Sequence, residues 1–442
     1  MSTPAAEMAS RARAASPGAD SADADAADRT DHPGFAPPTA ATDWLAAAGR
    51  VAEVAARHAD AVDRDARFPA EAFVELRREG LLSALIPPPA GGAGLSLDQV
   101  ARICETLAQG CSSTAMIYAM HQIQVACMVD HGMDVAWQRD ALARIASQQL
   151  LLASATSEEN IGGSMRTSAC AVERGHGADG IFRIEKRAPT VSYGAHADAI
   201  LITARRASDA APSDQVLIVA FHDQIELEKY GGWNALGMRG TCSEGFRLVA
   251  HGRLEQILPV PFASISGQTM LPVSHVLWAA VWTGIAAGAV NRAHAFFREA
   301  ARKQPGTLPP SAHRLAEANA LVHLMRSRVR AALETLAAQP RPRVDETGAH
   351  SPLSASLGFA CDMNTLKLAV SATALRAVEE ALMICGMAGY RNDTRYSVGR
   401  PLRDLFSAPL MISNDRIALN TANLLLAQRP ELRPESADER DH

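Results

Sequence analysis

The sequence has few aromatic residues and no excess of positive charge. Aromatic side chains make up 5% of the 442 residues, and 43 lysines and arginines stand against 48 aspartates and glutamates, which gives a formal net charge of −5. Nucleic-acid-binding surfaces combine basic charge with aromatic stacking platforms, and attraction to an anionic membrane also requires basic charge. The composition therefore predicts no nucleic-acid partner and no partner at a membrane surface.

Paired cysteine motifs are absent. The seven cysteines are spread over the whole chain, none of them forms CxxC, and none lies at zinc spacing from one of the 14 histidines. This pattern predicts a reduced protein with buried thiols and no metal site. The N-terminus also lacks the apolar run of a signal peptide, so we expect a cytoplasmic location.

The motifs of several common mechanisms are missing too. The chain contains no GxxxxGK[ST] phosphate loop, no HExxH zinc motif and no GxSxG nucleophile elbow. The glycines of Gly284–Gly288 lie inside a helical pattern with no strand before them, so they indicate helix–helix packing rather than a dinucleotide fingerprint. Local chemistry alone therefore indicates only a soluble protein of three parts.

Hydrophobic periodicity divides the chain into two helical regions with short strands between them. Apolar residues recur at helical spacing before about residue 148 and after about residue 263, and short alternating or continuous apolar runs lie between. The predicted fold class is α+β, with a helical N-terminal domain, a central β-barrel and a C-terminal helical bundle. The predicted boundaries are a disordered tail at 1–40, helices at 41–148, the barrel at 149–262, the bundle at 263–428 and a tail at 429–442.

One apolar segment is long enough to cross a membrane. Residues 271–290 contain only Ser274, His275 and Thr283 as polar side chains, and about 20 apolar residues span a bilayer. Its tryptophans, Trp278 and Trp282, lie in the middle rather than at the ends, where interfacial aromatic belts occur. We therefore expect a helix buried inside a large bundle and no membrane partner.

Several stretches resemble motifs of one flavoprotein family. The most specific is L-G-M-R-G-T at Leu236–Thr241. Weaker matches are Phe68–Glu71, Cys111–Met116, Ser157–Ser164, Ala188–Gly194, Arg302–Gly306, Ile384–Tyr390 and Arg403-Asp404. Together with the order of helices, strands and helices, these stretches resemble the acyl-CoA dehydrogenase superfamily over about residues 45–428.

This resemblance implies a flavin site in the β region. Ser157, Gly162, Gly163 and Ser164 stand where the family has T-E-P-G-A-G-S-D, a loop that presents backbone N–H groups and hydroxyls to the flavin and the thioester. Thr190 and Ser192 stand in the family's K-x-W-I-[TS]-N strand beside the flavin ring, with threonine in place of the tryptophan. The resemblance implies that the cofactor is FAD and that Ser157, Gly162, Gly163, Ser164, Thr190 and Ser192 bind it.

The resemblance also implies a second contribution to flavin binding from the C-terminal bundle. Arg302 falls in the family's R-x-x-F-G motif, whose arginine reaches a flavin diphosphate across a subunit boundary, and Pro305 replaces the stacking phenylalanine. Gly386 and Gly389 stand in the family's Q-x-x-G-G-x-G-[FY] motif and would allow the backbone to approach a ligand closely. A homodimer or homotetramer is the implied assembly.

The glutamate that acts as base in acyl-CoA dehydrogenases is missing. In most subfamilies it lies eight residues after the aspartate of the R-D pair, and here that position is Ile412. The nearest carboxylate is Asp415, which either serves as base on a shifted loop or caps the helix that follows it. Other subfamilies place the glutamate near Ser274, which is followed by His275, an acid–base candidate or a hydrogen-bonded core histidine.

The predicted function is FAD-dependent α,β-dehydrogenation of an acyl thioester, carried on CoA or a carrier protein. An electron-transfer flavoprotein or oxygen would reoxidise the flavin. Asp415 and His275 are the catalytic candidates, and Ser274 and His121 are the candidates for substrate contact. Two alternatives remain open: a flavin-dependent monooxygenase of the same fold, which needs no such glutamate, and a catalytically silent flavin- or acyl-binding relative.

Overall fold

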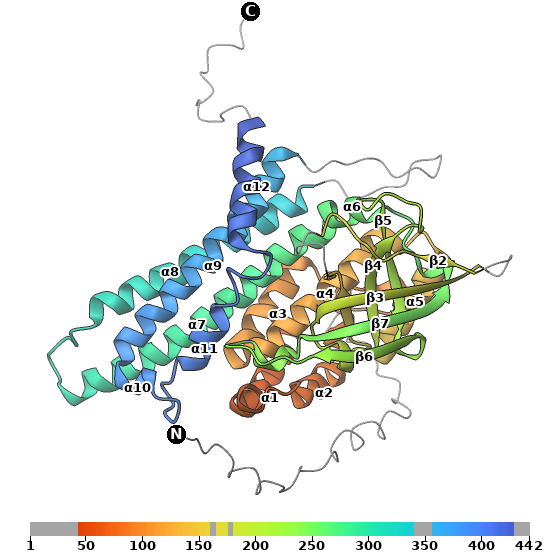
Figure 1. The fold of residues 1–442 in the computed structure, drawn as a ribbon. Helices are drawn as coiled ribbons and strands as arrows, with labels where there is room; N and C mark the ends of the chain where they lie inside the picture. Colours follow the sequence, from red (N-terminus) through yellow and green to blue (C-terminus); the bar gives the residue numbers. More distant parts are fainter. Residues whose placement is uncertain (1–42, 160–164, 176–179, 340–355, 428–442) are drawn as a thin grey trace, which may run out of the picture. The chain divides into compact units, whose positions relative to one another are not determined.

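The computed structural model describes residues 43–159, 165–175, 180–339 and 356–427 (Figure 1). The predicted tails, residues 1–40 and 429–442, lie outside the described residues. In the described part, helices come first, strands follow, and helices return, as the three-part α+β prediction requires.

Five helices and two short 3-10 turns form the N-terminal part. They are α1 (Trp44–Asp65), α2 (Ala70–Arg78), η1 (Leu81–Ser83), η2 (Pro88–Ala90), α3 (Leu97–Gly110), α4 (Ser112–Gly132) and α5 (Ala136–Gln148). Local sequence sets their starts: the Asp43 carboxylate accepts the N–H groups of the first turn of α1, and Ser96 and Gln99 form a reciprocal capping box on α3. Helix α4 is buried almost all round, so it forms the centre of this part.

Seven strands form two sheets in the middle part. The strands are β1 (Leu152–Ala155), β2 (Glu173–Arg174), β3 (Ile181–Val191), β4 (Ala199–Arg205), β5 (Gln215–Phe221), β6 (Ile225–Gly231) and β7 (Glu244–Arg253). Three short 3-10 turns lie between strands: η3 (Gly194–His196), η4 (His222–Gln224) and η5 (Arg239–Thr241). A fourth, η6 (Leu254–Gln256), follows β7 and precedes the C-terminal helices.

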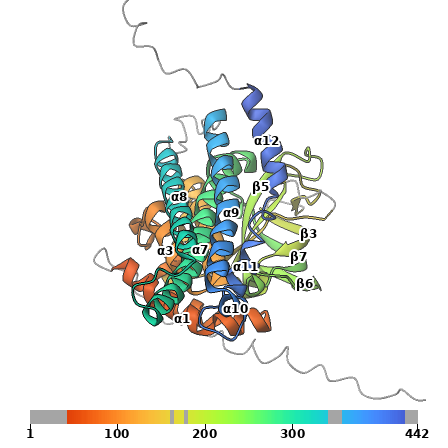
Figure 2. The same cartoon turned by 90° about the vertical axis from the view of Figure 1, so that its left-hand side faces the viewer.

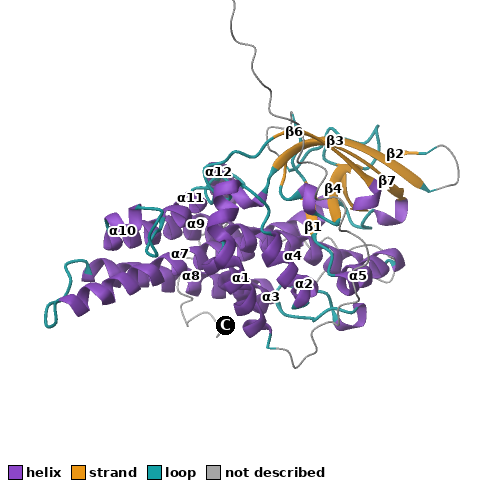
Figure 3. Cartoon of the chain, turned by 90° about the horizontal axis from the view of Figure 1, so that it is seen from below, coloured by secondary structure: helices purple, strands orange, loops and turns teal. Residues whose placement is uncertain are grey.

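The two sheets do not close into the expected barrel. One sheet has the order β1-β4-β5, in which β1 and β4 are parallel, and the other has the order β2-β3-β7-β6. Strand β5 is buried along its whole length, whereas β6 is largely exposed. The sheets lie together on one side of the helices (Figure 3). The β character of this part was thus predicted, but the open pairing was not.

The C-terminal part is a helical bundle. It consists of α6 (Phe262–Ile265), the π-helical turn η7 (Ser266–Met270), α7 (Leu271–Lys303), α8 (Ala312–Ala337), α9 (Leu357–Cys385), α10 (Met387–Tyr390), α11 (Gly399–Leu405) and α12 (Asn414–Ala427). Helices α7, α8 and α9 run side by side (Figure 2). Helix α12 packs on α9 with only two buried residues, Ile417 and Thr421.

The long apolar helix lies inside the protein. Residues Phe262–Lys303 form a continuous helical segment with mean hydropathy 1.5 over its most apolar window, and 94% of that window is buried by other parts of the protein. Helix α7 packs against α3, α4, α8 and α9. Packing within the protein therefore accounts for the apolar character of this segment, as the core-helix interpretation requires.

The turn Leu236–Thr241 joins the three parts. The backbone N–H of Met238 donates to the Asp404 carboxylate at 2.6 Å, and the Arg403 guanidinium forms an ion pair with Asp63 of α1. Any side chain at Gly237 would overlap the carbonyl of Arg403. The L-G-M-R-G-T motif is therefore explained by close packing between the sheets, α1 and α11.

Candidate functional site

A chain of hydroxyl groups lies where β3 ends. The Ser192 and Ser243 hydroxyl oxygens are 2.8 Å apart, Ser243 and Thr241 are also 2.8 Å apart, and the Ser157 hydroxyl donates to the Thr190 carbonyl at 2.6 Å. Three of the residues predicted to bind the cofactor, Ser157, Thr190 and Ser192, are thus brought to one edge of the sheets. Ser192 is only half-buried, so its hydroxyl can meet a ligand at this edge.

A buried glutamate, Glu158, precedes the residues of the predicted glycine-rich loop in the sequence. Gly162, Gly163 and Ser164 lie outside the described residues. Immediately before them, one Glu158 oxygen accepts the N–H groups of Ala169 and Cys170, at 2.9 and 2.7 Å, and the other accepts the Ser168 hydroxyl. The Lys186 ammonium lies 3.7 Å from the same carboxylate. The sequence analysis assigned no role to this buried pair.

A cavity lined by arginines lies in the C-terminal bundle, at the C-terminal half of α7. Arg302 lines a cavity of about 440 Å³ together with Arg292, Arg298 and Arg395, and Glu299 and Tyr396 complete much of its wall. The Arg292 guanidinium is held by the Ser397 carbonyl at 2.6 Å, and burial lowers its pKa. Three further arginines thus accompany the predicted one, a charge density suited to phosphate oxygens.

Of the two glycines predicted to bind the cofactor from the C-terminal bundle, Gly386 lies between α9 and α10, and Gly389 lies within α10. Gly386 has φ +54°, in the left-handed region that favours glycine, and a Cβ there would meet no atom within 4 Å. At Gly389 a Cβ would lie 2.7 Å from the Cys385 Cβ, so this position requires glycine for packing. Helix α10 and strand β3 lie at opposite ends of the described fold (Figures 1 and 3). A single chain therefore does not bring Arg302, Gly386 and Gly389 to the hydroxyl edge.

The structure separates the two catalytic candidates by their surroundings. Asp415 is exposed in the first turn of α12, where a carboxylate complements the helix dipole. His275 is buried, and its Nδ1 lies 3.1 Å from the Met363 carbonyl, so Nδ1–H donates and Nε2 carries the lone pair. Burial lowers the pKa of His275 to about 4, and the nearby Lys367 ammonium contributes to this shift. Ser274 donates to the Met270 carbonyl of its own helix at 2.5 Å.

A buried lysine connects the two positions at which a base was expected. Lys367 of α9 is fully buried, and its ammonium donates to the Asn414 side-chain oxygen at 2.5 Å. Asn414 in turn donates to the Ser371 hydroxyl at 3.1 Å, and the Trp282 ring centroid lies 5.8 Å from the ammonium. We call these residues, with His275, the Lys367 cluster. The cluster brings together His275, which follows Ser274, and Asn414, which lies two residues after Ile412.

The face of α7 in this region carries polar atoms without partners. His275, Trp278 and Trp282 share one side of the helix by their spacing of three and four residues. The buried Nε2 of His275 and the two indole nitrogens have no hydrogen-bond partner among the described residues. Buried polar atoms are normally satisfied, so this face calls for a ligand or water. No short motif marks Lys367: the nearest signal in the sequence is a single lysine inside an apolar helix.

His121 is occupied by the main chain. Its Nε2–H donates to the Leu82 carbonyl at 2.7 Å, and its Nδ1 accepts the Leu152 N–H at 3.0 Å. Burial lowers its pKa to about 4. Neither ring nitrogen is left for a substrate, so His121 ties α4 to β1 rather than pointing into a channel. Tyr118, on the same helix, donates to the Leu81 carbonyl at 3.3 Å.

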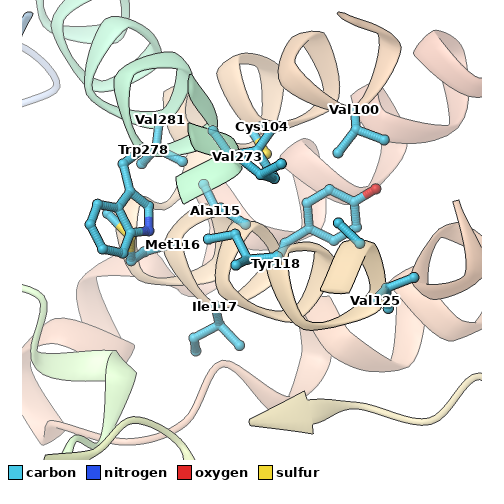
Figure 4. Close-up of a cluster of buried hydrophobic side chains, with 14 of the residues drawn as sticks. Val100, Cys104, Ala115, Met116, Ile117, Tyr118, Val125, Val273, Trp278 and Val281 are labelled. Carbon is cyan, nitrogen blue, oxygen red and sulfur yellow. The ribbon is translucent and has the colours of Figure 1, made fainter. Parts of the chain in front are cut away.

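Apolar side chains pack between α4 and α7. Figure 4 shows Met116 beside Trp278, with Ala115 and Val273 near them and Tyr118 farther along α4. All five belong to the continuous hydrophobic core. This region, where the resemblance places a substrate-channel helix, is therefore well packed in the structure.

Comparison with known proteins identifies the family. The acyl-CoA dehydrogenase N-terminal domain matches residues 45–149, and the acyl-CoA dehydrogenase C-terminal domain matches residues 266–411. Together these matches cover more than half of the chain. The chain belongs to the acyl-CoA dehydrogenase superfamily.

The proteins to which this chain is similar differ in activity. Amino sugar nitrososynthase DnmZ of Streptomyces peucetius is 25% identical over 362 residues, 79% of this chain and 84% of that protein. Cyclohex-1-ene-1-carbonyl-CoA dehydrogenase of Syntrophus aciditrophicus is 25% identical over 368 residues, 80% of this chain and 81% of that protein. FMN-bound TdsC, the dibenzothiophene monooxygenase of Paenibacillus sp. A11-2, has the same fold, with TM-score 0.73, 19% identity, and coverage of 87% of this chain and 97% of that one.

Membership of the superfamily supports a flavin-dependent oxidoreductase. It does not identify the substrate. At both positions where the sequence analysis expected the base, the chain has an uncharged residue, Ile412 or Ser274. The buried ionisable side chains beside these positions are Lys367 and His275.

Proposed function

We propose that this protein is a flavin-dependent monooxygenase. The observation that carries the proposal is the buried Lys367 ammonium between the two positions that would hold a catalytic glutamate. Abstraction of an α-proton requires a carboxylate in a desolvated pocket, and a buried cation beside it would lower the basicity of such a group. An oxygenation has no need of that base. The nitrososynthase and monooxygenase relatives support this choice.

The dehydrogenation predicted from the sequence is the second candidate, and the dehydrogenase relative supports it. It requires Asp415 or His275 to act as the base. Asp415 is exposed at the start of α12, outside any desolvated pocket. His275 has a lone pair on Nε2, but a pKa of about 4 makes it a weak base. The surroundings of both residues therefore favour oxygenation over proton abstraction.

The residues present fit a flavin with a diphosphate, and we propose FAD. The half-buried Ser192 hydroxyl and its hydrogen-bonded neighbours offer polar groups to the ring edge. The arginine-lined hollow around Arg302 offers positive charge to phosphates. Because the two places lie far apart in one chain, Arg302 would serve the flavin of a second copy, which supports a homodimer or homotetramer. A bound flavin would supply the two-electron redox chemistry.

This chain's own residues would orient the substrate and control water. Trp278, Trp282 and Met363 belong to the hydrophobic core, and His275 and Lys367 of the Lys367 cluster lie next to Met363 and Trp282. The apolar part of the substrate would pack on these residues, and the cluster would supply polar groups. Reducing equivalents would come from an external reductase, and oxygen would be the second substrate. The electron-transfer flavoprotein predicted as acceptor belongs to the dehydrogenase alternative.

Two reactions on the purified protein separate the candidates. In the first, flavin-loaded protein is mixed without oxygen with a panel of acyl-CoA thioesters, and the flavin absorbance is followed. In the second, the protein is mixed with the same thioesters or the corresponding free acids, a flavin reductase, NADH and oxygen, and products are analysed by mass spectrometry. We expect no bleaching in the first reaction and a product heavier by one oxygen atom in the second. Bleaching with formation of an enoyl product would establish the dehydrogenase instead, and no reaction in either would indicate a silent relative.

A further inference from the structure

The charge of Lys367 is not balanced within the described residues. Its side chain has 0% exposure, and no carboxylate of the described chain lies within 4.0 Å of its ammonium. The ammonium has three N–H groups, and the Asn414 side-chain oxygen accepts one of them. A buried charge without a counter-charge is costly, so this position calls for an anionic partner from outside the chain.

The neighbouring groups also offer more donors than acceptors. The indole N–H groups of Trp278 and Trp282 are buried and have no acceptor among the described residues. Trp282 lies against the ammonium, and the two indole rings are 6.4 Å apart. An anionic oxygen beside the ammonium would accept its remaining N–H groups, and the apolar body of the same molecule would pack on the tryptophans.

A route to this place is provided by the element that covers it. Asn414 is the first residue of α12, which buries only two side chains, Ile417 and Thr421. Hydrogen bonds at Asn414 and Thr421 also join it to α9. The preceding residues Phe406 and Leu410 are 44% and 77% exposed. Elements with few buried contacts open at low free-energy cost. Displacement of the start of α12 would uncover Lys367 without unfolding the bundle.

We propose that the Lys367 cluster is the subsite for a carboxylate of the substrate, and that the substrate is an apolar or aromatic carboxylic acid. This inference deepens the proposed function and rests on it, since it identifies the kind of molecule that the monooxygenase would accept. The same cation disfavours a substrate that presents an ammonium group here, because like charges repel strongly where water is excluded.

Binding of matched probes tests the subsite without any turnover. The flavin-loaded full chain is titrated at pH 7 with benzoate, with benzamide, which has the same shape but no charge, and with benzylamine, which is cationic. Calorimetry and the melting temperature report binding. We expect benzoate to bind at least about tenfold more tightly than benzamide, as a charge-assisted hydrogen bond provides, and benzylamine not to bind.

Two variants assign the effect to Lys367. In Lys367→Met the preference for benzoate over benzamide is expected to disappear. In Asn414→Asp the lysine remains but receives an internal carboxylate, so benzoate binding is again expected to weaken about tenfold or more. The matched control is Lys303→Met, at an exposed lysine paired with Glu299, which should leave the preference unchanged.

Equal binding of benzoate and benzamide to the unaltered protein would overturn the proposal, and so would a preference that survives in both variants. These outcomes are independent of the oxygenation assay. A benzoate preference without any oxygenated product would refute the monooxygenase function and leave the subsite standing. Oxygenation with no charge preference would refute the subsite alone.

Discussion

Lys186 and Lys367 are both completely buried, and their surroundings differ in one respect. The Lys186 ammonium donates to the carbonyl and hydroxyl of Thr203, both at 2.8 Å, and lies 3.7 Å from the Glu158 carboxylate. Lys367 has an amide oxygen and an aromatic ring but no carboxylate among the described residues. Burial lowers the pKa of both side chains. The first arrangement contains its own counter-charge, whereas the second lacks an anion. Only the second lies beside the two positions at which the sequence analysis expected the base.

Lys186→Met should have the largest effect on stability. It leaves the Glu158 carboxylate buried without its cation, and breaking a buried pair by removing one partner costs about 3–5 kcal/mol. Urea denaturation followed by circular dichroism measures the loss. The double variant Lys186→Met with Glu158→Gln should recover part of it. A loss below about 1 kcal/mol for the single variant would show that the pair is not a structural unit.

Asn414→Asp should change stability in the opposite direction. It gives the Lys367 ammonium the counter-charge that Lys186 already has, and a carboxylate in the first turn of α12 also complements the helix dipole. We expect a gain of about 1–2 kcal/mol in the same denaturation experiment. Destabilisation of that size would mean that the ammonium is already balanced.

Lys367→Met should cost less than about 1 kcal/mol at pH 7, because it removes an unbalanced charge rather than half of a pair. The comparison becomes sharper with pH. Burial lowers the pKa of Lys367 from its ordinary value of 10.5 to about 8, so between these values the unfolded chain binds more protons than the folded one. Raising the pH through this window should therefore stabilise the unaltered protein relative to Lys367→Met. Denaturation curves of both proteins from pH 7 to above pH 10.5 measure this difference, which should be absent for Lys303→Met.

Asp415→Asn should have the smallest effect. Asp415 is exposed at the start of α12, so we expect a change of stability within about 0.5 kcal/mol and unchanged turnover in the oxygenation assay. Thioester-dependent flavin bleaching that occurs with the unaltered protein and disappears in a folded Asp415→Asn variant would instead establish Asp415 as the base and favour the dehydrogenase.

Local patterns in the sequence predicted the elements better than their partners. Val51, Ala55, Ala59 and Val62 recur at helical spacing and form the buried face of α1. The β character of the middle part followed from short apolar runs, but alternation along a strand does not specify which edge pairs with which. The sequence analysis therefore predicted a barrel, whereas the strands form two separate open sheets.

The candidate site was only half accessible to sequence reasoning. Ser157, Thr190 and Ser192 follow a motif, and the structure brings them together. Lys367, His275 and Asn414 come from three helices, and nothing near any one of them indicates the others. Their meeting is set by the packing of α7, α9 and α12, which a single sequence does not encode locally.

The light attachment of α12 has a consequence for how this protein could change during evolution. Ile417 and Thr421 anchor the helix without belonging to the Lys367 cluster. Enlarging or trimming Ile417 would adjust how often the helix lifts while the recognition groups beneath it stay the same. Selection could thus tune the speed of ligand exchange separately from ligand choice.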